Sequence, residues 1–344
     1  MTVAGRTRTL RAAATALAAG AILACATPGG PTERVKIPPG ASLRIVSDTL
    51  VAHGIVTHPR WFRFLARVRG MDRVLQAGVY QLPRKTGSWQ VLTALTTGRV
   101  ATVRFTVPEG LTVLELADLA QSRLSIPRDS LVRVAFDSSE AHSAGLPPGG
   151  FEGFLMPETY QVPAGSTARD LLRMMTQQFQ EAWQPGWNAR LDSLGLTLVQ
   201  LVALASIVEG EARHAEERPI IAGVYWNRLR RGIALQADPT VQYAIQLKTG
   251  ERKTRLYFKD YDTPSIYNTY LHPGLPPGPV DSPGKESLAA ALYPADVPFL
   301  YFVARPDGHH VFSRTIDEHN RAVAQIRAEE RRRRRAFGAG TSPR

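Results

Sequence analysis

The sequence predicts an α+β protein in which a small module is followed by a larger domain. Short strand-like segments that end in Pro/Gly turns recur along the first half of the chain. Residues 112–124 and 167–183 have the periodicity of helices, and an apolar helix is expected further on. The chain has 344 residues with 44% hydrophobic content, which is enough for two folded regions. We expect them at residues 35–104 and 105–325.

The first 25 residues predict export from the cytoplasm. Three arginines precede a run of small and apolar residues, Ala12 to Ala24, which is too short for a membrane span but typical of a signal peptide. The run ends at Cys25, the only cysteine, so no intramolecular disulfide can form. The small residue before Cys25 resembles a bacterial lipobox, which predicts lipidation and attachment to a membrane. A simple signal peptide cleaved near Ala26 and an uncleaved anchor remain as alternatives.

The charge of the chain predicts an anionic partner. The formal net charge is +12, and part of the excess lies in an expected basic tail at residues 326–344. Basic surfaces suit nucleic acid, anionic lipid or an acidic cell-wall polymer. The sequence contains no zinc-finger spacing and no RNP-like aromatic motif, so a nucleic-acid partner is not expected. Residues 26–34, which are rich in Pro and Gly, are expected to be a linker.

An internal repeat organises the first half of the chain. Val35 to Leu43 matches Phe105 to Val113, and looser copies begin at Tyr80 and Tyr160. Each copy reads as a short strand, a Pro/Gly turn, a Ser or Thr N-cap and then a helix. Two such units between residues 35 and 104 predict a small βααβ module.

The segment with the clearest helix signal begins at Thr197. Thr197 and Gln200 have the spacing of a capping box, and Leu198 to Val208 is apolar nearly all round, as in a fully buried helix. The helix ends at Glu209, where desolvation and the negative end of the helix dipole both raise the pKa of a carboxyl group. A glutamate of that kind suits general acid catalysis. The alternative is a surface carboxylate that pairs with Arg213 or Arg218.

The remaining elements are expected in a regular order. We expect a helix from Glu216 to Arg231, a second helix with Asp238 as its N-cap, and a mobile loop at residues 248–261. Residues 299–303 and 310–313 predict a hairpin, and a terminal helix follows from residue 315.

The amino-acid sequences of several of these segments resemble one known family. LASIVEGEARHAEERPIIAGVYWNRLRRGIALQADPTVQYAI, which contains Glu209, is similar to the signature of the YceG-like family of endolytic murein transglycosylases (MltG). SIYNTYLHPGLPPGPV, SLAAALYP and FLYFVARPDGHHVFSRTIDEHNRAV also resemble it, as do VKIPPGASL and FTVPEGLTVLELADLA upstream. The likeness therefore runs from about Val35 to Val323. Two departures are Ile266, where the family more often has proline, and the lipobox-like segment at Cys25, since members of the family are usually held by one N-terminal transmembrane helix.

The resemblance implies a cell-wall lytic enzyme. Residues 35–104 would form a LysM-like module and residues 105–325 a YceG-like catalytic domain. Glu209 would protonate the glycosidic oxygen after an N-acetylmuramic acid residue and then act as base on the C6 hydroxyl of that sugar. The product would be a 1,6-anhydro end. No metal and no cofactor are expected, since no His/Cys/Asp cluster with metal-ligand spacing occurs in the sequence.

Several polar residues are candidates for binding the sugar chain, because amides and hydroxyls recognise sugar groups and aromatic rings stack on them. The candidate substrate-binding residues are Asn227, Gln236, Asp238, Thr240, Tyr267, Asn268 and Thr269. The expected partners are peptidoglycan glycan strands, the cytoplasmic membrane and peptidoglycan synthases, all in the bacterial cell envelope. Two alternatives stay open: a muramidase that uses water with Asp238 as second carboxylate, and a non-catalytic peptidoglycan-binding scaffold.

Overall fold

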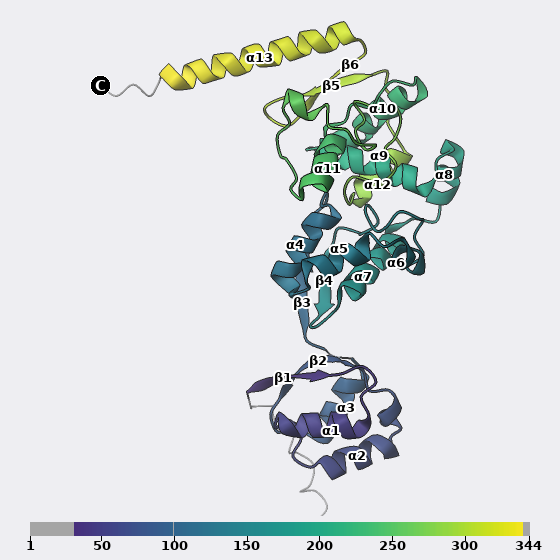
Figure 1. The fold of residues 1–344 in the computed structure, drawn as a ribbon, viewed down its shortest axis with the longest axis vertical. Helices are drawn as coiled ribbons and strands as arrows, with labels where there is room; N and C mark the ends of the chain where they lie inside the picture. The colour runs from purple at the N-terminus through teal and green to yellow at the C-terminus, as the bar shows by residue number, and fades with distance from the viewer. Residues whose placement is uncertain (1–30, 99, 340–344) are drawn as a thin grey trace, which may run out of the picture. The chain divides into compact units, whose positions relative to one another are not determined.

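The computed structural model describes residues 31–98 and 100–339 (Figure 1). The predicted signal segment and Cys25 lie outside the described residues. The chain splits into two compact units, the first ending at Ala101 and the second beginning at Thr102. Strand β3, Thr102–Thr106, pairs with β4, Thr159–Pro163, and this pairing assigns residues 102–104 to the second unit rather than to the first.

The first unit has the predicted βααβ order followed by a helix. Its elements are β1 (Thr32–Ile37), α1 (Leu43–Ala52), α2 (Pro59–Val68), η1 (Met71–Arg73), β2 (Gly78–Pro83) and α3 (Ser88–Thr96). The two strands pair antiparallel, with Val35 opposite Tyr80, and both side chains are buried in the core of this unit. Ser42 caps α1 by accepting a hydrogen bond from the amide of Ile45. The strand, turn and cap signal is therefore confirmed for the first copy, whereas in the second copy Gly87, not Ser88, is the N-cap of α3 and no side chain caps the helix.

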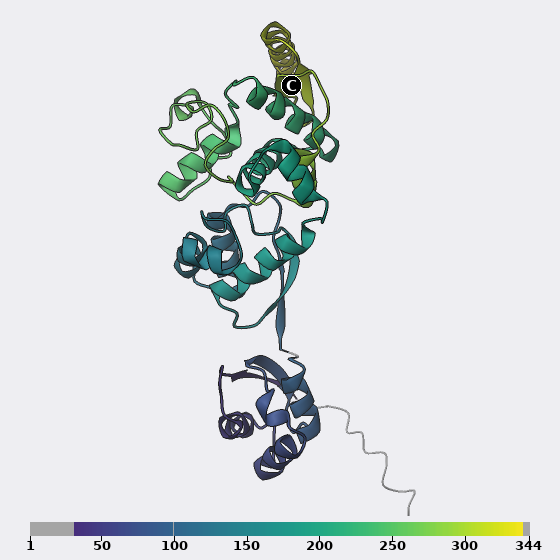
Figure 2. The same ribbon diagram turned by 90° about the vertical axis from the view of Figure 1, so that its right-hand side faces the viewer.

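The second unit begins with another copy of the same arrangement. Strands β3 and β4 form an antiparallel pair, and each leads through a turn into a helix (Figure 2). Phe105 lies opposite Tyr160, and both helices begin with a full capping box. The helices of this part are α4 (Val113–Leu124), α5 (Arg128–Ala135), α6 (Ser138–Ser143) and α7 (Ala168–Ala182). The four sequence repeats thus form two strand pairs, each pair made from two copies.

Helix α9, Leu198–Glu211, is the central helix of the second unit. Thr197 and Gln200 form the predicted capping box, and every residue from Leu201 to Val208 is buried. It is covered by α10 (Arg218–Arg230), α11 (Asp238–Thr249) and α12 (Lys285–Leu292), and it follows α8 (Trp187–Leu194). Because other elements cover all sides of α9, its apolar circumference fits the burial that the sequence predicted.

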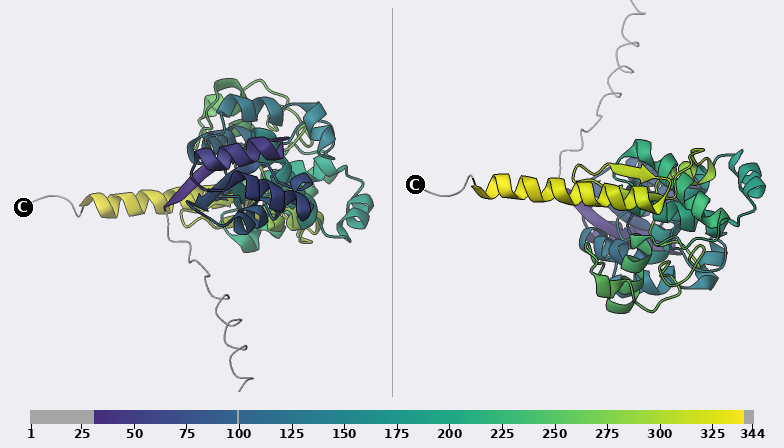
Figure 3. Two further views of the ribbon diagram at one scale, coloured as in Figure 1. Left: turned by 90° about the horizontal axis from the view of Figure 1, so that it is seen from below. Right: turned by 90° about the horizontal axis from the view of Figure 1, so that it is seen from above.

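The C-terminal part of the second unit contains a hairpin and a long helix. Its elements are η2 (Ala215–Glu217), η3 (Phe258–Asp260), β5 (Tyr301–Ala304), β6 (His310–Ser313) and α13 (Ile316–Ala339). The start of α13 packs on the hairpin, and the rest runs on as one helix (Figure 3). Within the described residues, no single helix is long and apolar enough to span a membrane, and the one pair that passes together, α8 with α9, is bent by 94°.

Two local expectations differ from the structure. Ala237 is the N-cap of α11, and Asp238 already lies inside the helix without a capping hydrogen bond. The loop at residues 248–261 is tied down at its base: Arg252 donates to the carbonyl oxygen of Gly110 at 2.7 Å. At its tip the Phe258 side chain is 90% exposed. The sequence could not show this because the partner of Arg252 lies far away along the chain.

Candidate active site

Glu209 lies in the last turn of α9 with its carboxylate almost enclosed, since only 7% of the side chain is exposed. Its Oε1 accepts a hydrogen bond from Arg218 Nη2 at 3.2 Å. Its Oε2 accepts from the backbone amide of Gly284 at 3.0 Å and from the hydroxyl of Ser287 at 2.7 Å. Gly284 is the N-cap of α12, so the carboxylate also sits at the positive end of that helix dipole.

These contacts correct the electrostatic environment that the sequence predicted for Glu209. The sequence indicated only that the Glu209 carboxyl group is desolvated and lies at the negative end of the dipole of α9, and both effects favour the protonated acid. The fold adds a guanidinium, an amide and a hydroxyl, and each of them stabilises the carboxylate anion. Of the two arginines considered as partners, Arg218 makes the ion pair, whereas Arg213 is exposed.

A second carboxylate, Glu109, lies beside Glu209 in the turn after β3. Arg218 Nη2 also donates to Glu109 Oε2 at 3.2 Å, so a single guanidinium bridges the two side chains. Desolvation raises the pKa of Glu109, and the charge of Glu209 and a hydrogen bond to it raise the pKa further, against the opposing effect of Arg218. Both effects favour the protonated form of Glu109, the carboxyl group that lies next to Glu209.

A third acid, Asp281, is fully buried behind the end of α9. Its Oδ2 lies 3.5 Å from Arg252 Nη2, and its Oδ1 has no hydrogen-bond partner within the described part of the chain. Burial raises the pKa of Asp281 well above its usual range. Gly210 makes this packing possible, because a Cβ there would lie 2.6 Å from Pro239 and 3.5 Å from Asp281 Oδ2.

Asp238 belongs to a separate acidic group. It accepts a hydrogen bond from the hydroxyl of Tyr270 at 2.7 Å, and its negative charge acts on Glu211. Glu211 accepts from Tyr225 at 3.0 Å, and burial of the carboxyl group raises its pKa to about 7, with the charge of Asp238 adding to the effect. The hydrogen-bond partners of Asp238 thus lie in the Glu211 group, not around Glu209.

Two of the predicted substrate-binding amides are used inside the protein. Asn227 Nδ2 donates to the carbonyl oxygens of Val297 and Phe299 at 2.7 and 2.9 Å. Asn268 is buried, and its Nδ2 donates to two carbonyl oxygens of its own loop at 2.8 and 2.9 Å. These bonds occupy the side-chain N–H groups, so in this structure both asparagines hold loops in place rather than presenting a free amide to a sugar.

The two predicted threonines are likewise buried. The hydroxyls of Thr240 and Thr269 lie 2.9 Å apart, and Thr269 Oγ1 accepts from the amide of Ala237 at 3.0 Å. They join the start of α11 to the loop before His272 and have no exposed group to offer a substrate. Gln236 differs, because it is exposed and has a left-handed backbone with φ of 48°. Tyr267 is half-buried, so it and Gln236 stay candidates for substrate contact.

Comparison with known proteins identifies the family. A model of the YceG-like family matches residues 35–325. The chain belongs to the YceG-like family. It is 29% identical over 315 residues to an endolytic murein transglycosylase of Bacillus subtilis (strain 168), covering 85% of this chain and 84% of that protein. It is 30% identical over 320 residues to a protein of the same name from Streptococcus pneumoniae serotype 2, covering 85% of this chain and 58% of that relative.

A solved structure shows the same fold. The crystal structure of a YceG-like protein from Listeria monocytogenes matches with a TM-score of 0.58 and 29% identity, over 85% of this chain and 99% of that one. The mixed helix and sheet architecture of this YceG-like chain therefore agrees with the α+β fold class that the sequence predicted.

The sequence analysis missed Glu109, Asp281 and Ser287 as members of this YceG-like site. One signal for Glu109 was present. Of the turns in the repeat, Pro38-Pro39-Gly40, Pro108-Glu109-Gly110 and Pro163-Ala164-Gly165, only the second carries a carboxylate. The sequence offers no comparable signal for Ser287, because a serine near a helix start is ordinary capping chemistry.

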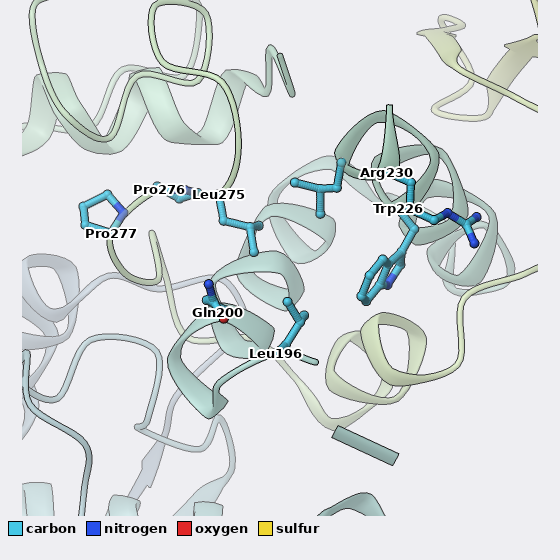
Figure 4. A pocket seen from close by; sticks show the side chains of 8 residues that line it. Leu196, Gln200, Trp226, Arg230, Leu275, Pro276 and Pro277 are labelled. Carbon is cyan, nitrogen blue, oxygen red and sulfur yellow. The ribbon is translucent and has the colours of Figure 1, made fainter. Parts of the chain in front are cut away.

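A separate pocket of about 500 Å³ opens beside the N-terminal half of α9 (Figure 4). It is lined by Leu196, Gln200, Trp226, Leu229, Arg230, Leu275, Pro276 and Pro277. Gln200 and Glu209 are separated by about 13 Å along the helix axis, at 1.5 Å per residue. None of the lining residues holds the Glu209 carboxylate, so this pocket is separate from the group of residues around Glu209.

Proposed function

We propose that this protein is a lytic transglycosylase that cuts peptidoglycan glycan strands at internal bonds between N-acetylmuramic acid and N-acetylglucosamine. The observation that carries the proposal is Glu209, which stands in the family signature at the end of the buried helix α9, held by Arg218 and the start of α12. Relatives named endolytic murein transglycosylase support the same class of reaction. The enzyme is thus a lyase of the bacterial cell wall.

The geometry fits a single acid/base group that acts twice. Glu209 first gives a proton to the glycosidic oxygen, and the bond to the muramic sugar breaks. The carboxylate left behind is stabilised by Arg218, the Gly284 amide and Ser287. It then takes the proton from the C6 hydroxyl of that sugar while this oxygen bonds to C1, so a 1,6-anhydro end forms, no water is consumed and Glu209 is again protonated. Glu109, with its raised pKa, can hold a proton beside it between turnovers.

A muramidase-type hydrolysis is the second candidate, favoured by one observation. Glycosidases that use water need two carboxyl groups at the scissile bond. The structure offers Glu109 for the second group, because it shares Arg218 with Glu209, whereas Asp238 is bound to Tyr270. The same position of Glu109 therefore supports either a proton-holding role or activation of a water molecule.

Mass spectrometry of the products distinguishes these reactions. Purified glycan strands digested by the protein are expected to yield fragments one water lighter than those from a hydrolytic muramidase used as control. Digestion in ¹⁸O-labelled water should leave the new ends unlabelled. Labelled reducing ends would contradict the transglycosylase and favour the hydrolase, and release of terminal disaccharides alone would contradict cutting at internal bonds.

We further propose that the first unit is a LysM-like module that holds the strand near the catalytic unit. Trp61 and Phe64 are exposed and stack with ring centroids 5.5 Å apart, and exposed Trp89 lies under the guanidinium of Arg69 at 5.3 Å. Exposed aromatic faces of this kind can stack on sugar rings. Co-sedimentation with insoluble peptidoglycan should weaken in Trp61→Ala, and unchanged binding would count against the module as a glycan holder.

The proposed location is the outer face of the cytoplasmic membrane, where strand cutting would terminate elongation beside peptidoglycan synthases. The basic net charge of +12 and the signal-like segment ending at Cys25 support attachment there. One acyl chain binds a membrane marginally, whereas two or more hold it firmly, so a lipidated Cys25 would be a stable anchor. Cys25→Ala should then release the protein from the membrane fraction, and unchanged membrane fractionation of that variant would argue for an uncleaved anchor.

A further inference from the structure

We propose that His214, Glu216 and His309 bind a divalent transition-metal ion, with zinc as the probe, at a surface site apart from the Glu209 carboxylate. One ligand atom from each side chain lies within 4.8 Å of the other two. His214 and Glu216 come from the turn at η2, directly after α9, and His309 comes from the turn between β5 and β6. The sequence analysis expected no metal because these two turns are far apart along the chain, and only the fold brings them together.

The separations are close to those that a tetrahedral ion requires. Zinc binds imidazole nitrogen and carboxylate oxygen at about 2.0–2.2 Å, which places two ligand atoms roughly 3.4 Å apart. His309 Nε2 lies 3.6 Å from Glu216 Oε1. The rings of His214 and His309 stack with centroids 3.6 Å apart and an angle of 15° between their planes. Nitrogen lone pairs that lie in two nearly parallel planes cannot both point at one ion between the ligands, so one ring has to turn on binding. His309 and Glu216 are exposed, so side-chain rotation of this size is unhindered.

Asp307 lies beside both imidazoles, within hydrogen-bond distance of His214 and just beyond that distance from His309. Its carbonyl oxygen lies 3.2 Å from His214 Nε2, and its carboxylate Oδ1 lies 3.7 Å from His309 Nδ1. Metal-bound histidines almost always donate their second ring N–H to a carbonyl or carboxylate oxygen, which fixes the tautomer and leaves the other nitrogen as ligand. For His309 the nitrogen left free is Nε2, the atom nearest to Glu216.

The backbone around the site holds the two turns together. Gly308 has φ of 91° and approaches His214 so closely that a Cβ at this position would lie 3.1 Å from its Nε2. Next to the site, His310 donates its backbone amide to Glu217 at 2.8 Å, and its Nδ1 lies 2.7 Å from the same carboxylate. The ligands therefore project from two turns that are already joined.

The position of the site indicates a structural role. None of the three ligands makes a hydrogen bond to Glu209. The segment that carries His214 and Glu216 continues directly into Arg218, which bridges Glu109 and Glu209. A bound ion would thus clamp this segment to the β5–β6 turn and steady the guanidinium that the active site uses.

Titration calorimetry with zinc chloride tests the proposal on the full chain, prepared without a polyhistidine tag and treated with a chelator. We expect one ion per chain to bind, with affinity reduced by at least about tenfold in His214→Ala, His309→Ala and Glu216→Gln. Asp307→Asn should weaken binding by about tenfold, the effect typical of an outer partner. His142→Ala, an exposed histidine on α6, is the matched control and should bind zinc like the wild type.

Two further readouts do not depend on enzymatic activity. Cobalt should give visible absorption bands in the wild type that are absent in His309→Ala, and zinc should raise the melting temperature of the wild type in a concentration-dependent way. Zinc binding of equal affinity and stoichiometry in the wild type and in His214→Ala/His309→Ala would overturn the proposal, as would the absence of binding in the wild type.

Discussion

Glu209→Gln is expected to reduce turnover on glycan strands by about 10²–10⁴-fold, the range typical of a lost general acid or base. Glutamine keeps the shape of the side chain, but it cannot give a proton to the glycosidic oxygen. Its amide group also turns two donor hydrogens toward a site whose neighbours, Arg218, the Gly284 amide and Ser287, are donors themselves. We therefore expect the free energy of unfolding to fall by about 1–2 kcal/mol relative to the wild type. Urea denaturation measures this change, and initial rates on glycan strands measure the loss of activity.

Ser287→Ala is the matched control for this variant. It removes one donor to Glu209 and keeps the carboxylate, so its fall in rate should be much smaller. Residual activity of more than a few per cent in a natively folded Glu209→Gln would show that another group supplies the proton. Glu109 would be the first residue to test, because it lies beside Glu209 and has a raised pKa.

Arg218→Met is expected to lower the unfolding free energy by roughly 2–3 kcal/mol near pH 8 and to remove most of the activity. The change leaves Glu109 and Glu209 next to each other without the guanidinium that now bridges them. This fall in unfolding free energy is smaller than the one expected when a fully buried ion pair loses a partner, because the Glu109 side chain is 41% exposed. Chemical denaturation and the rate on glycan strands measure the two effects.

The stability of Arg218→Met should also depend on pH in a defined direction. Arg218 lowers the pKa of Glu109 and the charge of Glu209 raises it, so removing the arginine moves the folded-state pKa of Glu109 further above its unfolded value. The folded state then retains a proton that the unfolded state has lost, and stability falls as the pH rises from the ordinary glutamate pKa of 4.5 toward the higher pKa of Glu109 in the folded variant. Lowering the pH should therefore restore stability to the variant.

The pH dependence is measured as the difference in unfolding free energy between Arg218→Met and the wild type at each pH. Burial also raises the pKa of Glu152 to about 8 and that of Glu211 to about 7, so the wild type itself loses some stability over the same range. Arg213→Met is the matched control, because this exposed arginine makes no ion pair in the described residues. A variant at Arg218 with the same pH profile as the wild type would contradict the coupled carboxylate pair.

Local signals in the sequence were sufficient to predict helix α9 and the position of Glu209. Capping boxes involve residues three apart, and an apolar circumference is visible in one stretch of chain, so Thr197, Gln200 and the buried run that follows could be identified without a fold. The repeated strand, turn and cap were visible for the same reason. These features depend on neighbours in the sequence, and the structure contains them where they were expected, except that Gly87 rather than Ser88 is the N-cap of α3.

The partners of the polar groups were decided only by the tertiary structure. Asn227, Asn268, Thr240 and Thr269 looked like sugar-binding groups, but the fold brings backbone carbonyls and hydroxyls from other segments against them. A hydrogen bond depends on distance and direction over a few tenths of an ångström, and no local pattern encodes those.

The same reason explains the chemistry around Glu209. The desolvation of its carboxylate followed from the apolar helix, but Glu109, Gly284 and Ser287 reach it from segments many residues away. The sequence by itself determined which residue ends the buried helix. The packing of α9 against α12 and the turn after β3 decided which charges surround it, because electrostatic effects on a buried acid depend on the groups that folding brings within a few ångströms.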